Sequence, residues 1–395
     1  MKPSKYILPV IVVSQFCCTS LWFAGNGVIN DLVTNFNLNE TALGHLTSAV
    51  QFGFIIGTLI FAILTISDRF SPSKVFLVSA FLGALFNLGI LWESNSLISL
   101  LLLRFFTGFF LAGIYPVGMK IATDYFKNGL GKSLGFLVGA LVIGTAFPHL
   151  LNGIPEAFNW KTVLITTSSL AVFGGLLMYI FVANGPYRKP SKYLDFSVFL
   201  KVFQNKKFRS VTFGYFGHAW ELYAFWAFTP IILKKYSFDN PELTFNISTI
   251  SFFIIGIGGI ACILSGYLSL KYGAKKIAFI SLLLSCICCL IYPFVIQIEN
   301  HFLFFGFLFF WGMVVIADSP LLSSLVAQNT IPEQKGTALT IVNSIGFFIT
   351  IISIQIITQL LEVTNSNNIY VILAIGPILG LIALRKYDDT SSRNN

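Results

Sequence analysis

The chain contains the stretch SDRFSPSK at residues 67–74 and a related stretch, GYLSLKYGAKK, at residues 266–276. Each of the two stretches follows a long run of apolar residues. Aligning Arg69 with Lys271 and Lys74 with Lys276 gives the same offset of 202 residues, about half of a chain of 395. Internal repeats on this scale are typical of membrane proteins built from two related halves. The sequence therefore predicts a duplicated fold.

Apolar residues dominate the composition. Hydrophobic residues make up 55% of the chain and charged residues 10%, against about 25% charged residues in a typical soluble domain. A helix of roughly 20 apolar residues is long enough to cross about 30 Å of hydrocarbon. Twelve runs of that length are present, beginning near Tyr6, Thr41, Val75, Leu97, Leu130, Val163, Val211, Ile247, Lys276, Phe302, Gly336 and Ile369. We expect an all-α membrane protein with twelve spanning helices.

The net charge of +9 is distributed unevenly over this twelve-span arrangement. Twenty of the 25 Lys and Arg residues fall in segments that would share one side of the membrane, whereas only Lys161, Lys234 and Lys235 fall on the other. This is the positive-inside pattern, which places both termini in the cytoplasm. The positive net charge is therefore explained by the orientation of the chain in the membrane. It gives no reason to expect a nucleic-acid partner. We expect an integral protein of a bacterial cytoplasmic (inner) membrane.

The one long polar connection divides the chain into two bundles of six helices. We expect an N-terminal bundle at residues 1–183, a cytoplasmic linker at 184–210, a C-terminal bundle at 211–385 and a cytoplasmic tail at 386–395. Basic residues in the linker would lie beside anionic lipid headgroups, so membrane lipid is an expected partner.

Enzyme chemistry is not indicated by the reactive residues. The six cysteines all fall within expected spans, where a cysteine behaves as a small apolar residue. Cys286, Cys288 and Cys289 are closely spaced, but residues two apart point to different sides of a helix and no histidine accompanies them. The sequence contains no HExxH motif, nucleophile elbow or phosphate loop. We expect no metal, no cofactor and no enzymatic activity, and any driving force must be a gradient.

At these two loops the chain resembles the Major Facilitator Superfamily. The family pattern is matched in the first loop by Asp68, Arg69 and Lys74, and in the second by Gly266, Lys271, Gly273, Lys275 and Lys276. Two further matches are Arg104 with Gly108 in the fourth span, and a worn glycine-proline motif in the fifth span at Gly135, Gly139, Gly144 and Pro148. The resemblance implies that both loops are gating loops. It also implies two six-helix bundles around a central cavity lined mainly by spans one, four, seven and ten.

Charged residues inside expected spans occur in three of those four helices. They are Arg104, Glu221 and Asp318. A charged residue at the centre of a span costs about 2.5 to 3.5 kcal/mol on insertion scales, so such residues indicate function or pairing. His218 precedes Glu221 by three residues, which places both on one helix face where they could share a proton. We therefore take His218, Glu221, Asp318 and Arg104 as candidate proton-coupling residues.

Structural roles remain open for two of these residues. Asp318 is followed by Ser319 and Pro320, and an acid beside a helix break can satisfy freed backbone donors. For Arg104 the family resemblance implies either proton coupling or anchoring of the fourth helix to the first. Uncharged candidates for substrate binding at similar depth are Gln15, Trp22, Gln51, Tyr115 and Asn343, although a single aromatic residue more often has a packing role.

The leading hypothesis is a secondary active transporter. It would act as a monomer and move a small polar solute, such as a metabolite or organic anion, by alternating access. Symport with protons, or with another coupling ion, would drive it. A proton-driven efflux pump for amphipathic compounds is an alternative, supported by the aromatic content and the worn motif. A membrane sensor that kept the fold without transport is a further alternative.

Overall fold

The computed structural model describes residues 5–39, 41–126, 130–154, 159–188, 202–330, 335–364 and 366–386. The described elements are all helical. Those of the first half are α1 (Ile7–Thr19), α2 (Ala24–Gly27), α3 (Ile29–Asn35), α4 (Ala42–Ile63), α5 (Ile66–Arg69), α6 (Pro72–Gly89), α7 (Leu97–Leu111), α8 (Tyr115–Tyr125), α9 (Leu130–Asn152) and α10 (Trp160–Phe181). Those of the second half are α12 (Lys206–Asp239), α13 (Ile247–Tyr272), α14 (Ala274–Val295), α15 (His301–Ala317), α16 (Ser319–Gln328), α17 (Lys335–Val363), η2 (Asn367–Ala374) and α18 (Ile375–Arg385).

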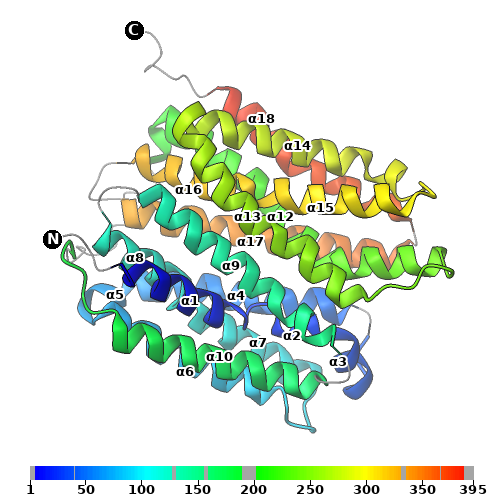
Figure 1. The fold of residues 1–395 in the computed structure, drawn as a ribbon, viewed down its shortest axis with the longest axis horizontal. Helices are drawn as coiled ribbons and strands as arrows, with labels where there is room; N and C mark the ends of the chain where they lie inside the picture. The colour runs from blue at the N-terminus through cyan, green and yellow to red at the C-terminus, as the bar shows by residue number, and fades with distance from the viewer. Residues whose placement is uncertain are drawn as a thin grey trace.

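The long helices run roughly along one common axis, as Figure 1 shows, and the start of α1 and the end of α18, next to the two termini, lie at the same end of the molecule. We call this end the termini side and the other end the opposite side. The helices of the first half lie below those of the second half in the view of Figure 1. The arrangement is consistent with the expected two-bundle architecture.

Ten helical segments of the described chain are long and apolar enough to cross a membrane. Two of the twelve expected spans are not among the ten. The first is broken into α1, α2 and α3, of which α1 is a shorter apolar helix. The seventh expected span lies in α12, a helix of 34 residues that also contains charged and polar side chains. The ten segments together with these two elements agree with the expected twelve spans.

The termini side of the first half is held together by hydrogen bonds to the chain after α10. The hydroxyl of Tyr125 donates to the carbonyl of Ala183 at 2.7 Å. Ser71 Oγ lies 2.9 Å from Asn184 Oδ1, and the Arg188 guanidinium donates to the carbonyl of Phe70 at 2.9 Å. The helix α12 already begins at Lys206, inside the expected linker. Linker residues 189–201 and tail residues 387–395 lie outside the described residues.

The two expected gating loops differ in their local structure. In the second loop, Gly273 lies between the end of α13 and the start of α14. Its φ of +86° is in a region that glycine adopts more readily than other residues. Lys271 and Lys276 on either side of the turn lie 5.1 Å and 6.0 Å from the ring of Tyr272. In the first loop Arg69 Nε donates to Thr65 Oγ1 at 3.1 Å. The side chain of Asp68 lies outside the described residues.

The two halves contact each other mainly through two helix pairs, α9 with α13 and α4 with α17. Hydrogen bonds between the halves lie toward the opposite side in the described chain. Gln355 Nε2 on α17 donates to the Gly44 carbonyl at 3.1 Å and to Ser48 Oγ at 2.7 Å on α4. Asn246, just before α13, donates to the carbonyl of Gly153 at 2.9 Å. These bonds close the opposite side of the interface.

The contact between α9 and α13 loosens toward the termini side. A Cβ built on Gly139 would lie 3.1 Å from the Gly259 carbonyl oxygen, so the backbones are close there. One turn nearer the termini side, a Cβ on Gly135 would lie 3.6 Å from the carbonyl oxygen of Cys262. A Cβ on Gly266 would meet no atom within 4 Å. The structure is therefore closed on the opposite side and more open on the termini side.

Candidate solute and coupling site

A small cavity lies between the two halves near the middle of the bundle. Its volume is about 30 Å³, about the share of one water molecule in the liquid. The first half contributes side chains from α8 and α9, and the second half contributes side chains from α12, α15, α16 and α17. The lining residues are Tyr115, Val138, Leu141, Tyr215, His218, Ala219, Leu222, Tyr223, Ile316, Ser319, Gly346, Phe347 and Thr350.

Polar groups are scattered over this otherwise apolar wall. The hydroxyl-bearing residues are Tyr115, Tyr215, Tyr223, Ser319 and Thr350. Apolar pockets with a few placed polar groups are the usual form of small-molecule sites, in which the polar groups fix the orientation of the ligand. The cavity thus has the composition of a binding site, although a solute larger than water needs the halves to separate.

His218 on the cavity wall pairs with Asp318. Nδ1 of His218 lies 2.8 Å from Oδ1 of Asp318, and the side chains are only 3% and 1% exposed. The pair joins α12 to the junction between α15 and α16, where Asp318 ends one helix and precedes the next. Neither carboxylate oxygen makes a hydrogen bond of ordinary geometry. The two side chains are therefore in close contact, and the carboxylate has capacity left for a proton or a ligand.

The carboxylate of Asp318 does not cap the helix that it precedes. The backbone N–H groups of Leu321 and Leu322 donate to the Asp318 carbonyl, at 3.0 Å and 2.8 Å, and its side chain makes no capping bond. The expected alternative role, in which the acid satisfies backbone donors freed at the break, is therefore not what the structure shows. The side chain faces His218 instead.

Glu221 occupies a different environment from His218. Its Oε1 accepts hydrogen bonds from Ser285 Oγ at 2.5 Å and from Trp311 Nε1 at 2.7 Å, and Cys289 Sγ lies at 3.2 Å. These partners come from α14 and α15, within the second half. Residues three apart on a helix differ by about 60° in direction, so one can face the cavity while the other faces a neighbouring helix. The sharing of a proton between His218 and Glu221 that their spacing suggested has no counterpart among the contacts.

Arg104 binds the break in the first span. The fully buried guanidinium donates to the carbonyl of Leu21 at 3.1 Å and also to the carbonyl of Trp22. These carbonyls follow the end of α1, where the helical hydrogen bonds stop. No carboxylate of a described side chain lies within ion-pair distance of Arg104. Of its two expected roles, the contacts match anchoring of the fourth span to the first.

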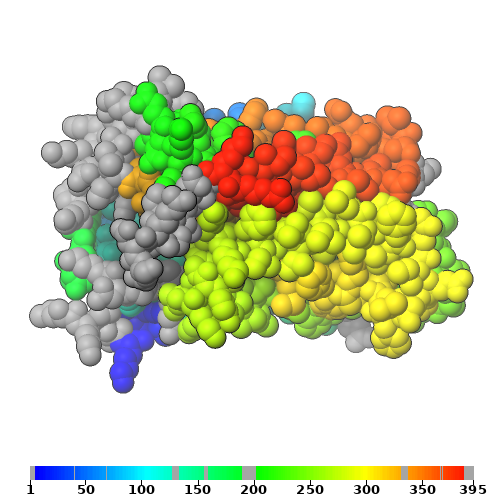
Figure 2. Space-filling view, turned by 90° about the horizontal axis from the view of Figure 1, so that it is seen from above, coloured from blue at the N-terminus to red at the C-terminus, as the bar shows by residue number. Residues whose placement is uncertain are grey.

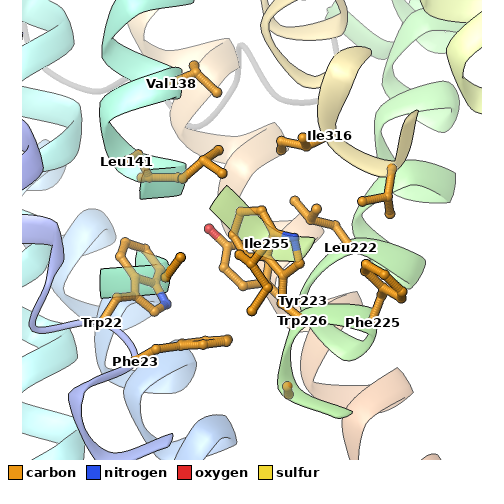
Figure 3. Close-up of a cluster of buried hydrophobic side chains, with 14 of the residues drawn as sticks. Trp22, Phe23, Val138, Leu141, Leu222, Tyr223, Phe225, Trp226, Ile255 and Ile316 are labelled. Atoms are coloured by element: carbon orange, nitrogen blue, oxygen red, sulfur yellow. The ribbon is translucent and has the colours of Figure 1, made fainter. Parts of the chain in front are cut away.

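Two predicted substrate residues lie at the cavity or beside it. Tyr115 is on the wall. Trp22 is fully buried and stacks on Tyr223 at 5.8 Å and on Phe347 at 5.6 Å between ring centroids. Figure 3 shows Trp22 and Phe23 of the first half facing Tyr223 and Trp226 of the second. This aromatic cluster links the halves beside the cavity.

The other three predicted substrate residues do not line the cavity. Gln15 and Gln51 are fully buried, and their side-chain amides have no hydrogen-bond partner. Gln15 lies against Gly118 of α8, where a Cβ would be 2.4 Å from its Oε1. Asn343 is partly buried on α17, one turn before Phe347. Substrate roles for these residues stay predictions that would require a different arrangement of the halves.

Several residues of the site were not anticipated from the sequence. Tyr215, Tyr223 and Thr350 line the cavity, and Ser285 and Trp311 bind Glu221. The sequence could have indicated Tyr215, because Tyr215, His218 and Leu222 follow the i, i+3, i+7 spacing of one helix face. This spacing shows which residues share a face of the helix, but it does not show which other helix packs against that face.

Comparisons with curated proteins find transporters. "Uncharacterized transporter YgaY" of Escherichia coli O157:H7 is 25% identical over 240 residues, covering 57% of this chain and 59% of that protein. "Probable galactarate/D-glucarate transporter GudP" of Bacillus subtilis is 26% identical over 187 residues, covering 44% of this chain and 39% of that protein. The chain thus spans about 40 to 60% of the length of these relatives.

Solved structures share the fold over nearly the whole chain. A crystal structure of the nucleoside transporter NupG superimposes with a TM-score of 0.73 at 13% identity, covering 96% of this chain and all of that one. A bacterial homologue of the human lysosomal transporter Spinster, in an inward-facing and unoccupied conformation, gives 0.65 at 13% identity, covering 98% and 95%. The Major Facilitator Superfamily model matches residues 11–388. The chain therefore belongs to the Major Facilitator Superfamily.

Proposed function

We propose that this protein is a secondary active transporter that moves a small polar solute across a bacterial cytoplasmic membrane. The two halves would alternate access to the cavity, and proton movement would be coupled through His218 and Asp318. The observation that carries the proposal is the buried His218–Asp318 pair, in which His218 lies on the wall of a cavity between two halves of a transporter fold and Asp318 lies behind it.

The coupling argument follows from the charge of the buried pair. With one shared proton the pair is neutral overall. Removing that proton leaves a net negative charge and adding a second leaves a net positive one, and either is costly in a site without water. Opening of the cavity to water lowers this cost. Proton exchange is therefore expected in the open states and suppressed when the cavity is closed.

The surroundings of the pair are mostly neutral groups. The titratable groups near Asp318 are Tyr215 and Glu221 of α12 and Cys262 of α13. Tyr115 of α8 adds a further hydroxyl to the wall. No Lys or Arg is among the residues that line the cavity. Asp318 and Glu221 are thus the two acids nearest the cavity, and Asp318 is the one paired with a residue of its wall.

This charge distribution also bears on the solute. A wall with several hydroxyls and no Lys or Arg, and with Asp318 directly behind His218, is better suited to a neutral, hydroxyl-rich molecule than to a dianion. The names of the relatives supply suitable probes, a nucleoside and the dicarboxylate galactarate. We propose the neutral class as the substrate.

A thermal-shift screen of the purified protein tests the solute class, because a ligand stabilises the state that binds it. Nucleosides, neutral sugars and galactarate would be compared at two pH values. Stabilisation by a neutral, hydroxyl-rich compound at either pH is expected. Stabilisation by galactarate alone would contradict the proposed class.

Export of amphipathic compounds is a second candidate function, favoured by the aromatic cluster beside the cavity. Trp22, Tyr223 and Phe347 offer ring faces on which a flat apolar compound could stack. Drug-susceptibility profiling of a deletion strain distinguishes the two functions. Hypersensitivity to several amphipathic compounds, together with a thermal-shift screen that shows no polar hit, would favour export.

A further inference from the structure

A second and much larger concavity lies away from the cavity, on the outer surface of the second half. It is a groove of about 850 Å³ between α12, α17 and α18. Figure 2 shows α18 in red, with residues from the start of α12 in green beside its C-terminal end and orange residues of the α17 region along its flank. The lining residues are Lys206, Arg209, Ser210, Phe213, Phe216, Gly217, Trp220, Ile349, Ile352, Ile375, Gly376, Leu379, Ile382, Ala383 and Lys386.

The floor of the groove is made by glycine backbones. A Cβ on Gly217 would lie 2.3 Å from the Gly376 carbonyl oxygen, and a Cβ on Gly376 would lie 2.5 Å from the Gly217 carbonyl oxygen. The backbones of helices α12 and α18 therefore approach closely here, and the Trp220 side chain also packs against Gly376. The larger side chains on either side, such as Phe213 and Leu379, stand above this floor and form the walls.

The groove is basic at one end and apolar along its length. Lys206 and Arg209 at the start of α12 and Lys386 after the end of α18 are exposed and lie on the termini side. No carboxylate lies within ion-pair distance of these three cations in the part of the chain that the structure describes. The apolar walls are exposed as well, with Phe213 at 51% and Leu379 at 61%. An occupant needs an anionic end and a long apolar part.

The length and direction of the groove match one leaflet of a bilayer. From Lys206 to Trp220 helix α12 rises about 21 Å at 1.5 Å per residue. One leaflet contributes about 15 Å of hydrocarbon, half of the usual 30 Å, with its headgroups beyond. The three cations therefore lie at headgroup level while Phe213 and Leu379 lie at the level of the acyl chains.

We propose that this groove binds one anionic phospholipid of the leaflet on the termini side. The phosphate lies among Lys206, Arg209 and Lys386, and an acyl chain lies along the glycine floor toward Trp220. Basic pockets between spanning helices on the cytoplasmic side are suited to anionic headgroups. Three cations with no carboxylate beside them among the described residues favour an anionic over a zwitterionic lipid. The site is independent of the proposed solute and of the coupling residues.

Native mass spectrometry of the full-length protein tests the proposal. The protein in detergent would be titrated with phosphatidylglycerol or phosphatidylethanolamine that carry the same acyl chains. We expect one phosphatidylglycerol to be retained in preference to phosphatidylethanolamine. The triple variant Lys206→Gln, Arg209→Gln, Lys386→Gln should bind it at least roughly tenfold more weakly, since each surface cation contributes to attraction.

A matched control separates this site from general surface charge. The variant Lys74→Gln, Lys271→Gln, Lys276→Gln removes three exposed cations from the same side and should retain the lipid as the wild type does. Leu379→Trp, which fills the groove without changing charge, should also lose it. Equal retention of both lipids by the wild type, or wild-type retention by the Lys206, Arg209 and Lys386 variant, would overturn the proposal. The proposal would also be overturned if the wild type formed a dimer without bound lipid and Leu379→Trp disrupted that dimer. Such a result would show that a second copy of the chain occupies the groove.

Discussion

Three ionisable side chains inside the expected spans have three different kinds of partner. Asp318 faces an imidazole, Glu221 accepts hydrogen bonds from neutral donors, and Arg104 donates to backbone carbonyls. Only the Asp318–His218 pair is both ionisable on each side and adjacent to the cavity. This difference in partners is why we assign proton coupling to the pair and a positioning role to Glu221 and Arg104.

Substitution of Glu221 tests this division of roles. Glu221→Gln keeps an acceptor oxygen for Ser285 and Trp311, so it should fold normally and keep pH-gradient dependence of transport. Glu221→Leu removes the acceptor and leaves two buried donors unpaired, at about 1 to 3 kcal/mol each. We expect a clear loss of thermal stability for Glu221→Leu only, measured by unfolding in detergent. Loss of gradient dependence in a well-folded Glu221→Gln protein would return the coupling role to Glu221.

Arg104 is expected to be a structural anchor whose geometry matters. The planar guanidinium reaches the carbonyls of Leu21 and Trp22 together, whereas the ammonium of Arg104→Lys is a compact point donor on a different stem. The change should lower stability by about 1 to 3 kcal/mol, as for a buried acceptor left unpaired. Thermal unfolding measures this effect. A well-folded Arg104→Lys protein whose uptake no longer responds to pH would show that Arg104 takes part in coupling.

The sequence singled out the charged residues within the expected spans but did not give their partners. His218 and Glu221 are three residues apart, so local spacing suggested that they interact. The actual partner of His218, Asp318, is 100 residues further along and is brought to it by the tertiary packing of α12 against α16. Hydropathy does not determine how a helix is rotated about its axis, and that rotation decides which side chain meets which.

At the scale of elements, the helices of the two halves come closest where glycine residues lie at their interface. Where glycines face the partner helix, as at Gly44 opposite Thr358 and at Gly139 opposite Gly259, the helices are close. Small residues at a helix interface permit such contact. The hydrogen bonds of Gln355 lie beside Gly44, so the seam of α4 with α17 combines close packing and polar contacts on the opposite side.

Gly44→Ala should shift the balance between the two access states. A Cβ at Gly44 would lie 2.0 Å from Oγ1 and 2.9 Å from Cβ of Thr358. Overpacking of this kind typically costs about 1 to 3 kcal/mol, which corresponds to a five- to 150-fold change in an equilibrium. Distances between spin labels on the outer ends of α4 and α17 should lengthen.

A matched control is available for this element. Gly306→Ala, in α15, adds the same methyl group where no atom lies within 4 Å. The control should leave the label distances unchanged. Unchanged distances in Gly44→Ala as well would show that this seam does not hold the opposite side closed.

Most of the elements were predictable, and the exceptions have physical causes. Apolar length alone identified the ten segments of the described chain that are long and apolar enough to cross a membrane. The break of the first span after Thr19 was not predicted, because it depends on Arg104, 85 residues away, supplying donors for the freed carbonyls. The pattern of charges likewise could not show that α12 already begins at Lys206, within the polar connection.

At the scale of the whole molecule, the structure shows one arrangement of the two halves. The opposite side is closed by the α4–α17 and α9–α13 seams, and the cavity between the halves has a volume of only about 30 Å³. Transport requires a second state in which these seams open, and the His218–Asp318 pair then meets water on the other side. The protonation of this pair would differ between the two access states. A proton gradient could therefore shift the equilibrium between these states through the pair.

The most direct test is uptake by proteoliposomes under an imposed pH gradient, with the solute identified by the thermal-shift screen, for the wild type and Asp318→Asn. Asparagine keeps the shape of the side chain but cannot exchange a proton. We predict that Asp318→Asn still binds the solute and equilibrates it across the membrane, but no longer accumulates it against its gradient. Full gradient-driven accumulation by Asp318→Asn would contradict coupling through this pair.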